Sequence, residues 1–153
     1  MSQLSIDEVL SKIYEYQRVN DIKGQCITNT QFLYNFIKKH YPDTKMKTVA
    51  CIVYHDSGEY RRICINHILL KINNIIIDPS YEYHILNNKT YFYSYEDFFL
   101  TVYECGYKHE YMKTKYLNDF LFMIKISTMI NITGKPTKNI DYDYYNVLES
   151  LLK

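Results

Sequence analysis

The residue with the clearest chemical potential is Cys26, which follows Gly24 and Gln25. Apolar residues recur at helical spacing after it, so we expect a helix to begin near Gln25 or Cys26. The free amides and the dipole at a helix N-terminus favour a thiolate, which is the nucleophilic form of cysteine. Gly24 lets the backbone turn sharply before the helix and leaves room for a substrate carbonyl. Cys26 is therefore a candidate nucleophile.

A general base and its partner are predicted in a β-hairpin further along the chain. His67 begins one arm, Asp78 ends the other, and Asn73-Asn74 forms the turn, since Asn tolerates the positive φ of tight turns. Counting outward from the turn places His67 and Asp78 about two residues out of direct register. A carboxylate at that offset reaches an imidazole nitrogen and fixes the tautomer, while the other nitrogen faces the thiol. The sequence thus predicts a catalytic triad of Cys26, His67 and Asp78.

Both segments resemble the transglutaminase-like, papain-type superfamily of thiol enzymes. Residues 24–26 (GQC) are similar to the sequence around the nucleophile of transglutaminases, and residues 66–80 (NHILLKINNIIIDPS) resemble the family's His-hairpin-Asp-Pro segment. The order Cys, His, Asp also matches, and the resemblance covers residues 20–82. The chain departs from the family in lacking the Trp that frequently follows the nucleophile or the histidine. The resemblance implies a papain-like fold and the amide chemistry of proteases, transglutaminases, deglycosylating amidases or arylamine acetyltransferases.

The chemistry expected of such a triad is acyl transfer without a cofactor. Cys26 attacks an amide carbonyl, His67 accepts the thiol proton and returns it to the leaving amine, and Asp78 orients the imidazole. Water as the second acceptor gives a cysteine hydrolase that acts on a protein or peptide, which is the leading hypothesis. An amine acceptor gives a transglutaminase or another acyltransferase. The remaining alternative is a catalytically inactive papain-like module that binds a protein.

The oxyanion that forms during such a reaction needs two hydrogen-bond donors. The backbone amide of Cys26 is one by its position at the helix start. For the second donor we consider three amide side chains, those of Asn20, Gln17 and Gln25.

The other cysteines, Cys51, Cys64 and Cys105, are interpreted as structural, because free cysteine is usually buried. Cys64 and His67 are three residues apart, and an odd separation on a regular strand points two side chains to opposite faces. No second pair of ligands occurs at a spacing that suits zinc, so we expect no metal site.

Composition excludes several other classes of function. The net charge of the 153 residues is +1 and Lys and Arg form no basic stripe, so nucleic acid is not an expected partner. No apolar stretch is long enough for a membrane span, and no signal peptide precedes the first helix. We therefore expect a cytoplasmic protein with free thiols. The abundance of Ile, Lys, Asn and Tyr suits an A+T-rich genome, such as that of a large DNA virus.

The elements that must position the triad follow from the hydrophobic periodicity. A capping box at Ser5 and Glu8 predicts the first helix start, and Pro42 ends the second helix. The patterns predict helices at about 6–17, 26–41, 95–105, 110–130 and 141–152, and strands at about 46–54, 60–65, 67–72, 75–77 and 91–93. We assign residues 1–153 to one α+β domain of papain-like fold, with helices first, an antiparallel sheet in the middle and helices last.

Overall fold

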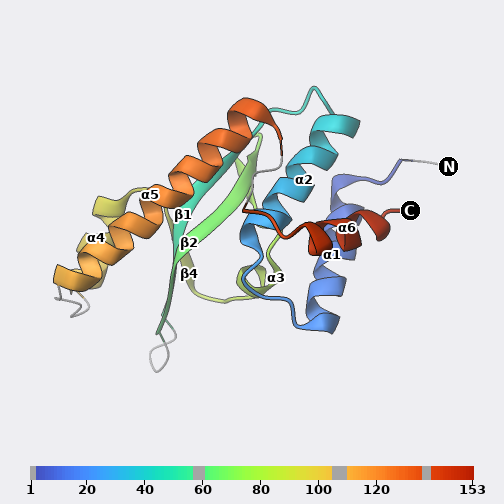
Figure 1. The fold of residues 1–153 in the computed structure, drawn as a ribbon. Coiled ribbons are helices and arrows are strands. Elements are labelled where there is room, and N and C mark those ends of the chain that lie inside the picture. Colours follow the sequence, from blue (N-terminus) through green and yellow to red (C-terminus); the bar gives the residue numbers. More distant parts are fainter. Residues whose placement is uncertain (1–2, 57–60, 105–109, 136–138) are drawn as a thin grey trace.

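The computed structural model describes residues 3–56, 61–104, 110–135 and 139–153, and these form an α+β fold with a small antiparallel sheet (Figure 1). The helices are α1 (Ile6–Asn20), α2 (Cys26–His40), α3 (Tyr81–His84), α4 (Tyr95–Glu104), α5 (Glu110–Thr133) and α6 (Tyr142–Ser150). The strands are β1 (Met46–Asp56), β2 (Arg61–Ile72), β3 (Ile75–Ile77) and β4 (Lys89–Phe92). The predicted order of helices, sheet and helices is confirmed, except that the four-residue helix α3 was not predicted.

The first helix starts as its capping box predicts. The amide of Glu8 donates to the Ser5 hydroxyl and the amide of Ser5 donates to the Glu8 carboxylate, each at 3.1 Å. These bonds satisfy two of the amides that a helix start leaves free. Helix α1 continues to Asn20, three residues beyond the predicted Gln17. Gln17 is therefore a helical residue on the buried face of α1.

The second helix begins at Cys26, as predicted. Gly24 just before it has a φ of +73°, a left-handed conformation that costs a side-chain-bearing residue energy. This turn brings the chain from the loop into α2 so that Cys26 occupies the first helical position. The predicted stop is also confirmed, because α2 ends at His40, before Pro42.

The sheet has the strand order β3-β2-β1-β4, and every neighbouring pair is antiparallel. Strand β2 is one continuous strand that pairs with β1 on one side and β3 on the other. Asn73 and Asn74 have φ values of 51° and 66°, which a tight two-residue hairpin turn requires. Strand β1 continues to Asp56, two residues beyond its predicted end and into the turn expected at 56–59. The rest of that turn, and Tyr60 at the start of the return strand, lie outside the described residues.

A β-bulge interrupts the pairing of β1 with β2. Cys51 pairs with His67, and Val53 pairs with Cys64, so two steps along β1 match three steps along β2. The extra residue on β2 shifts the alternation of side chains by one. Cys64 therefore lies on the same face of the sheet as His67. The sequence prediction that these two residues point to opposite faces is wrong, because it assumed a regular strand.

The two faces of the sheet are covered differently. Helix α5 runs across β1 and β2, and α2 lies along β2 (Figure 1). Together they bury one face in the main core, which includes Ile52, Ile68 and Leu70 of the sheet and Met123 and Ile126 of α5. The other face carries a smaller cluster of buried residues, Cys51, Val53, Leu69 and Tyr83. The partly buried side chains of Cys64 and Tyr91 pack against this cluster.

The C-terminal helices follow the predicted ranges closely. Helix α5 ends at Thr133 rather than Ile130, and Gly134 follows it with a φ of +63°.

Asp141 caps α6 by accepting a hydrogen bond from the Tyr144 amide at 3.0 Å. Ser94 caps α4 by accepting a hydrogen bond from the Asp97 amide, while the predicted end of that helix at about 105 lies outside the described residues. None of the helices in the described part of the chain is both long enough and apolar enough to cross a membrane.

Candidate active site

His67 and Asp78 meet in the interior of the protein. The Nε2 atom of His67 lies 2.7 Å from Oδ2 of Asp78, and the two residues are only 0% and 5% exposed. The pairing of Leu70 with Ile77 in the hairpin sets this geometry, since it leaves His67 two residues beyond the position opposite Asp78. The predicted register is confirmed.

Asp78 is held by further hydrogen bonds to both of its carboxylate oxygens. The hydroxyl of Tyr91 donates to Oδ2 at 2.8 Å, and the amide of Ser80 donates to Oδ1 at 3.0 Å. The hydroxyl of Tyr14 donates to the backbone carbonyl of the same residue. A buried carboxylate needs such donors to remain charged. These hydrogen bonds hold the Asp78 carboxylate in one orientation toward His67.

The charge of Asp78 determines the protonation behaviour of His67. Complete burial pushes the pKa of His67 down, because it disfavours the charged imidazolium. The charge and hydrogen bond of Asp78 more than offset this effect, and the Cys26 side chain adds a contribution of the same sign. The pKa of His67 is consequently raised well above its ordinary value.

Cys26 reaches the site because α2 lies beside residues 66–68 of β2, on the side where β3 pairs only with residues 70–72. The thiol of Cys26 donates to the carbonyl of Asn66 at 3.3 Å, and the hydroxyl of Thr30 donates to the carbonyl of Ile68 at 3.1 Å. The two donors are one helical turn apart, about 6 Å of rise, and the two carbonyls are two strand residues apart, about 6.6 Å. Because the two spacings match, both hydrogen bonds can form at once, which sets the position of α2 along β2 and places the Cys26 thiol beside His67.

The second ring nitrogen of His67, Nδ1, is the one that does not contact Asp78. Nδ1 is buried and has no hydrogen-bond partner among the described residues. The Cys26 side chain is close enough to raise the pKa of the imidazole, although its thiol donates to the Asn66 carbonyl. The rings of Tyr83 and Tyr91 lie 4.3 and 6.3 Å from the imidazole, measured between ring centroids. These aromatic neighbours exclude water from the ring and limit its movement.

A cavity of about 260 Å³ opens beside Cys26. Its lining comes from the loop before α2 and the first turn of that helix, the bulged part of β2, helix α3 and the segment before α6. The residues are Gly24, Gln25, Cys26, Ile27, Thr28, Cys64, Asn66, Glu82, Tyr83 and Asn139. The Gly24 amide donates to the Glu82 carboxylate at 3.2 Å, which ties the loop before Cys26 to α3. The cavity is the place where a substrate could reach the thiol.

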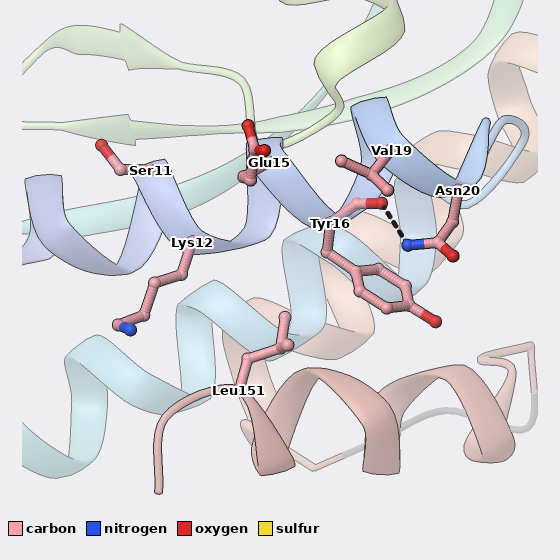
Figure 2. A pocket seen from close by; sticks show the side chains of 7 residues that line it. All are labelled: Ser11, Lys12, Glu15, Tyr16, Val19, Asn20 and Leu151. Carbon is pink, nitrogen blue, oxygen red and sulfur yellow. Dashed lines mark hydrogen bonds between the residues drawn. The ribbon is translucent and has the colours of Figure 1, made fainter.

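The three amide side chains considered for the oxyanion lie in different environments. Gln25 lines the cavity, and its amide nitrogen donates to Asp141 at 3.2 Å instead of capping α2. Asn20 is exposed at the end of α1, where its amide donates to the carbonyl of Tyr16 at 2.9 Å. It lines a separate surface pocket of about 440 Å³ between α1 and Leu151 (Figure 2). Of the three, only Gln25 lines the cavity beside Cys26.

Gln17 belongs to a buried network that supports the segment after Asp78. Its amide nitrogen donates to the Pro79 carbonyl at 2.8 Å, and its amide oxygen accepts from the Tyr81 amide at 3.1 Å. Asn29 of α2 donates to the same oxygen at 3.2 Å and accepts from the Tyr144 hydroxyl at 2.6 Å. The network therefore connects α1, α2, α6 and residues 79–81 behind the site.

Two residues that the structure brings to the site could not be recognised as site residues from the sequence. Tyr91 was predicted only as part of a short strand. Because the chain has 18 tyrosines, the residue type alone does not single out Tyr91 as a site residue. Cys64 was interpreted as structural, and only knowledge of the bulge would have placed it beside the cavity. The described cysteines Cys26, Cys51 and Cys64 are all free thiols.

No protein-family model, curated protein or solved structure matches this chain.

Proposed function

We propose that the protein is a cysteine hydrolase of papain-like type that cleaves amide or peptide bonds through an acyl-enzyme intermediate. The observation that carries this proposal is the buried 2.7 Å contact of His67 with Asp78, with the Cys26 side chain near the same imidazole. A buried imidazole fixed by a carboxylate on one side and adjoining a thiol on the other is the arrangement needed for nucleophilic catalysis by cysteine. The cavity beside the thiol gives a substrate access.

The proposed reaction begins with transfer of the thiol proton to Nδ1 of His67, the nitrogen that has no other partner among the described residues. Cys26 then attacks the substrate carbonyl, and the carbonyl π electrons move onto oxygen. Collapse of this intermediate breaks the C–N bond, and His67 protonates the leaving amine. Water, deprotonated by His67, then attacks the thioester and releases the carboxylic acid and the thiol. The raised pKa of His67 favours the first step, because it makes the imidazole a stronger proton acceptor.

The oxyanion is proposed to bind at the start of α2. The backbone amide of Cys26 points out of the first helical turn, where the helix dipole also favours negative charge. Gln25 is the proposed second donor because it lines the cavity. Its side-chain amide would exchange its bond to Asp141 for one to the substrate oxygen.

The experiment that tests the proposal is competitive alkylation with iodoacetamide at pH 7, followed by peptide mass spectrometry. Burial raises the pKa values of Cys51 and Cys64, so both remain thiols at this pH. Cys64 is nevertheless more exposed than Cys26, and exposure alone would predict that it reacts first. We expect Cys26 to react first, and His67→Ala and His67→Gln to slow its reaction. Equal labelling of the cysteines, or no effect of either variant, would indicate a binding module without a working triad.

Two product assays separate hydrolysis from transfer. Release of fragments from a peptide substrate, abolished by Cys26→Ser, is the result expected of the hydrolase. Incorporation of a labelled primary amine into a glutamine-bearing protein, without fragment release, would assign the same triad to a transglutaminase or another acyltransferase.

A further inference from the structure

The cavity beside the candidate nucleophile contains a second thiol. Cys26 contributes to it from the start of α2, and Cys64 contributes from β2. The Cys26 sulfur lies 3.3 Å from the carbonyl oxygen of Asn66, which is two residues along the strand from Cys64. The bulge turns Cys64 toward the face that carries His67. In a regular strand the same thiol would point to the opposite face.

From this arrangement we propose that Cys64 is an oxidative modification site, which forms a disulfide with Cys26 after a peroxide has oxidised the nucleophile. The inference rests on the proposed function in one respect, since it needs Cys26 to react as a thiolate. It goes beyond that function by assigning a role to a residue that takes no part in amide cleavage.

The proposed chemistry takes place in two steps. The Cys26 thiolate attacks one oxygen of hydrogen peroxide, the O–O bond breaks, and the departing hydroxide takes up a proton to give water, which leaves a sulfenic acid. The Cys64 thiolate then attacks the Cys26 sulfur, the S–O bond breaks, and hydroxide leaves and takes the thiol proton. Two thiols and one peroxide thereby become one disulfide and two waters. A dithiol reductant reverses the change by thiol–disulfide exchange.

The charges around Cys64 suit this role. Burial raises the pKa of Cys64, which keeps it a thiol while the nucleophile works. The positive charge of His67 acts in the opposite direction and stabilises the Cys64 thiolate, whereas a negative charge on Cys26 destabilises it. Oxidation of Cys26 to a neutral sulfenic acid removes that unfavourable charge. The second step is therefore favoured once the first has occurred.

Cys51 provides the matched control. It pairs with His67 across the β1–β2 ladder, yet it is fully buried in the cluster with Val53 and Leu69. It is not among the residues that line the cavity. Burial and the nearby negative charge of Asp78 also raise its pKa well above the ordinary value. Cys51 is therefore close to the site but does not line the cavity, and we expect it not to react with peroxide or with oxidised Cys26.

The test is titration of the full-length protein with hydrogen peroxide, followed by mass spectrometry of peptides that have not been reduced. We expect a Cys26–Cys64 linked peptide in the wild-type protein and in Cys51→Ala, and full recovery of iodoacetamide labelling at Cys26 after treatment with dithiothreitol. In Cys64→Ser, we expect Cys26 to proceed to the sulfinic acid, with loss of that recovery. The wild-type measurement alone decides the matter if the variants fold poorly.

The remaining outcomes distinguish the two proposals. If dimedone traps a sulfenic acid at Cys26 but no linkage to Cys64 forms, and Cys64→Ser recovers as the wild type does, the role of Cys64 is overturned while the nucleophile stands. If peroxide leaves Cys26 unmodified in every variant, both the reactive thiol and the disulfide are overturned. A Cys26 linkage to Cys51 or Cys105 would also overturn the assignment of Cys64.

Discussion

The hydroxyl of Tyr91 donates a hydrogen bond to the same carboxylate oxygen of Asp78 that binds the His67 imidazole. The phenol ring is also nearly parallel to the imidazole, with an angle of 12° between their planes. Tyr91 comes from β4 at the far edge of the sheet, while Asp78 follows β3 at the opposite edge. One side chain thus connects the two ends of the sheet through the candidate catalytic pair.

Tyr91→Phe is expected to lower the free energy of unfolding by about 1.5–3 kcal/mol, the typical value of a hydrogen bond to a charged group. The aromatic ring remains, so the loss reports on the hydroxyl alone. Urea denaturation provides the measurement. Tyr93→Phe is the control, because Tyr93 is 38% exposed and should tolerate loss of its hydroxyl with a change below about 0.5 kcal/mol. Equal effects of the two substitutions would contradict a special role for Tyr91.

Asp78→Asn is expected to slow alkylation of Cys26 at pH 7 by about tenfold or more, since each unit lost from the pKa of His67 changes its protonation equilibrium tenfold. The substitution preserves the shape of the side chain but removes the charge that raises the pKa of His67. Rates of iodoacetamide labelling measure the effect. Asp143→Asn on α6 serves as the control, because Asp143 is exposed and should leave the rate unchanged. A normal rate in Asp78→Asn would exclude this carboxylate from the site's chemistry.

The stability of the protein should depend on pH through His67. Its pKa is raised on folding, so the folded state binds the proton more tightly than the unfolded state. The resulting stabilisation is complete below the unfolded pKa of about 6.5 and is lost as the pH rises through the folded pKa. Unfolding free energies measured from pH 6 upward should therefore fall more steeply for the wild type than for His67→Gln, by up to about 1.4 kcal/mol per pH unit. Parallel curves for the two proteins would contradict the raised pKa.

Thr30→Val tests the attachment of α2 to the edge of β2. The substitution keeps the volume and removes the hydroxyl that binds the Ile68 carbonyl, so we expect a loss of about 1–3 kcal/mol for a buried group left unsatisfied. Cys26 labelling should slow as well, because the helix start loses one of its two anchors. Thr128→Val removes an exposed hydroxyl that bonds only to the Ile124 carbonyl of its own helix, and it should affect neither measurement.

Gly24→Ala is expected to cost roughly 1–2 kcal/mol, the penalty for a left-handed backbone at a residue that carries Cβ. Nothing lies within 4 Å of the added carbon, so the cost belongs to the backbone and not to a clash. Gly134→Ala is a close match, since Gly134 has a φ of +63° at the end of α5. Both variants should be less stable in thermal or urea unfolding, whereas only Gly24→Ala should slow Cys26 labelling. A change in labelling with Gly134→Ala would show that the effect is global.

The parts of the site that could be predicted from the sequence are those set by local interactions. The offset of His67 from Asp78 follows from the Asn73-Asn74 turn, because a two-residue hairpin fixes the register by counting. The position of Cys26 follows from the glycine and the helical pattern around it. Each of these depends on residues close together in the chain.

The parts that could not be predicted depend on contacts between distant segments. The bulge between Cys64 and His67 leaves no mark in the pattern of residues 61–72, so the face of Cys64 could not be assigned correctly. The bond from Tyr91 to Asp78 requires β4 to pair with β1, and nothing in the local pattern specifies that pairing. Helix α3 is a single turn, too short for its periodicity to be recognised. The positions of α5 and α6 were predicted, but not the elements they contact.

The hydrogen bond between Tyr144 and Asn29 makes the support behind the candidate site depend on helix α6. The two residues are 115 positions apart, and their bond closes the network around residues 79–81. A nascent chain that has exposed Cys26, His67 and Asp78 but not yet Tyr144 holds the reactive groups without the last support behind them. The network is therefore complete only when α6 is present. A chain interrupted before α6 is expected to hold the candidate nucleophile in a less ordered site.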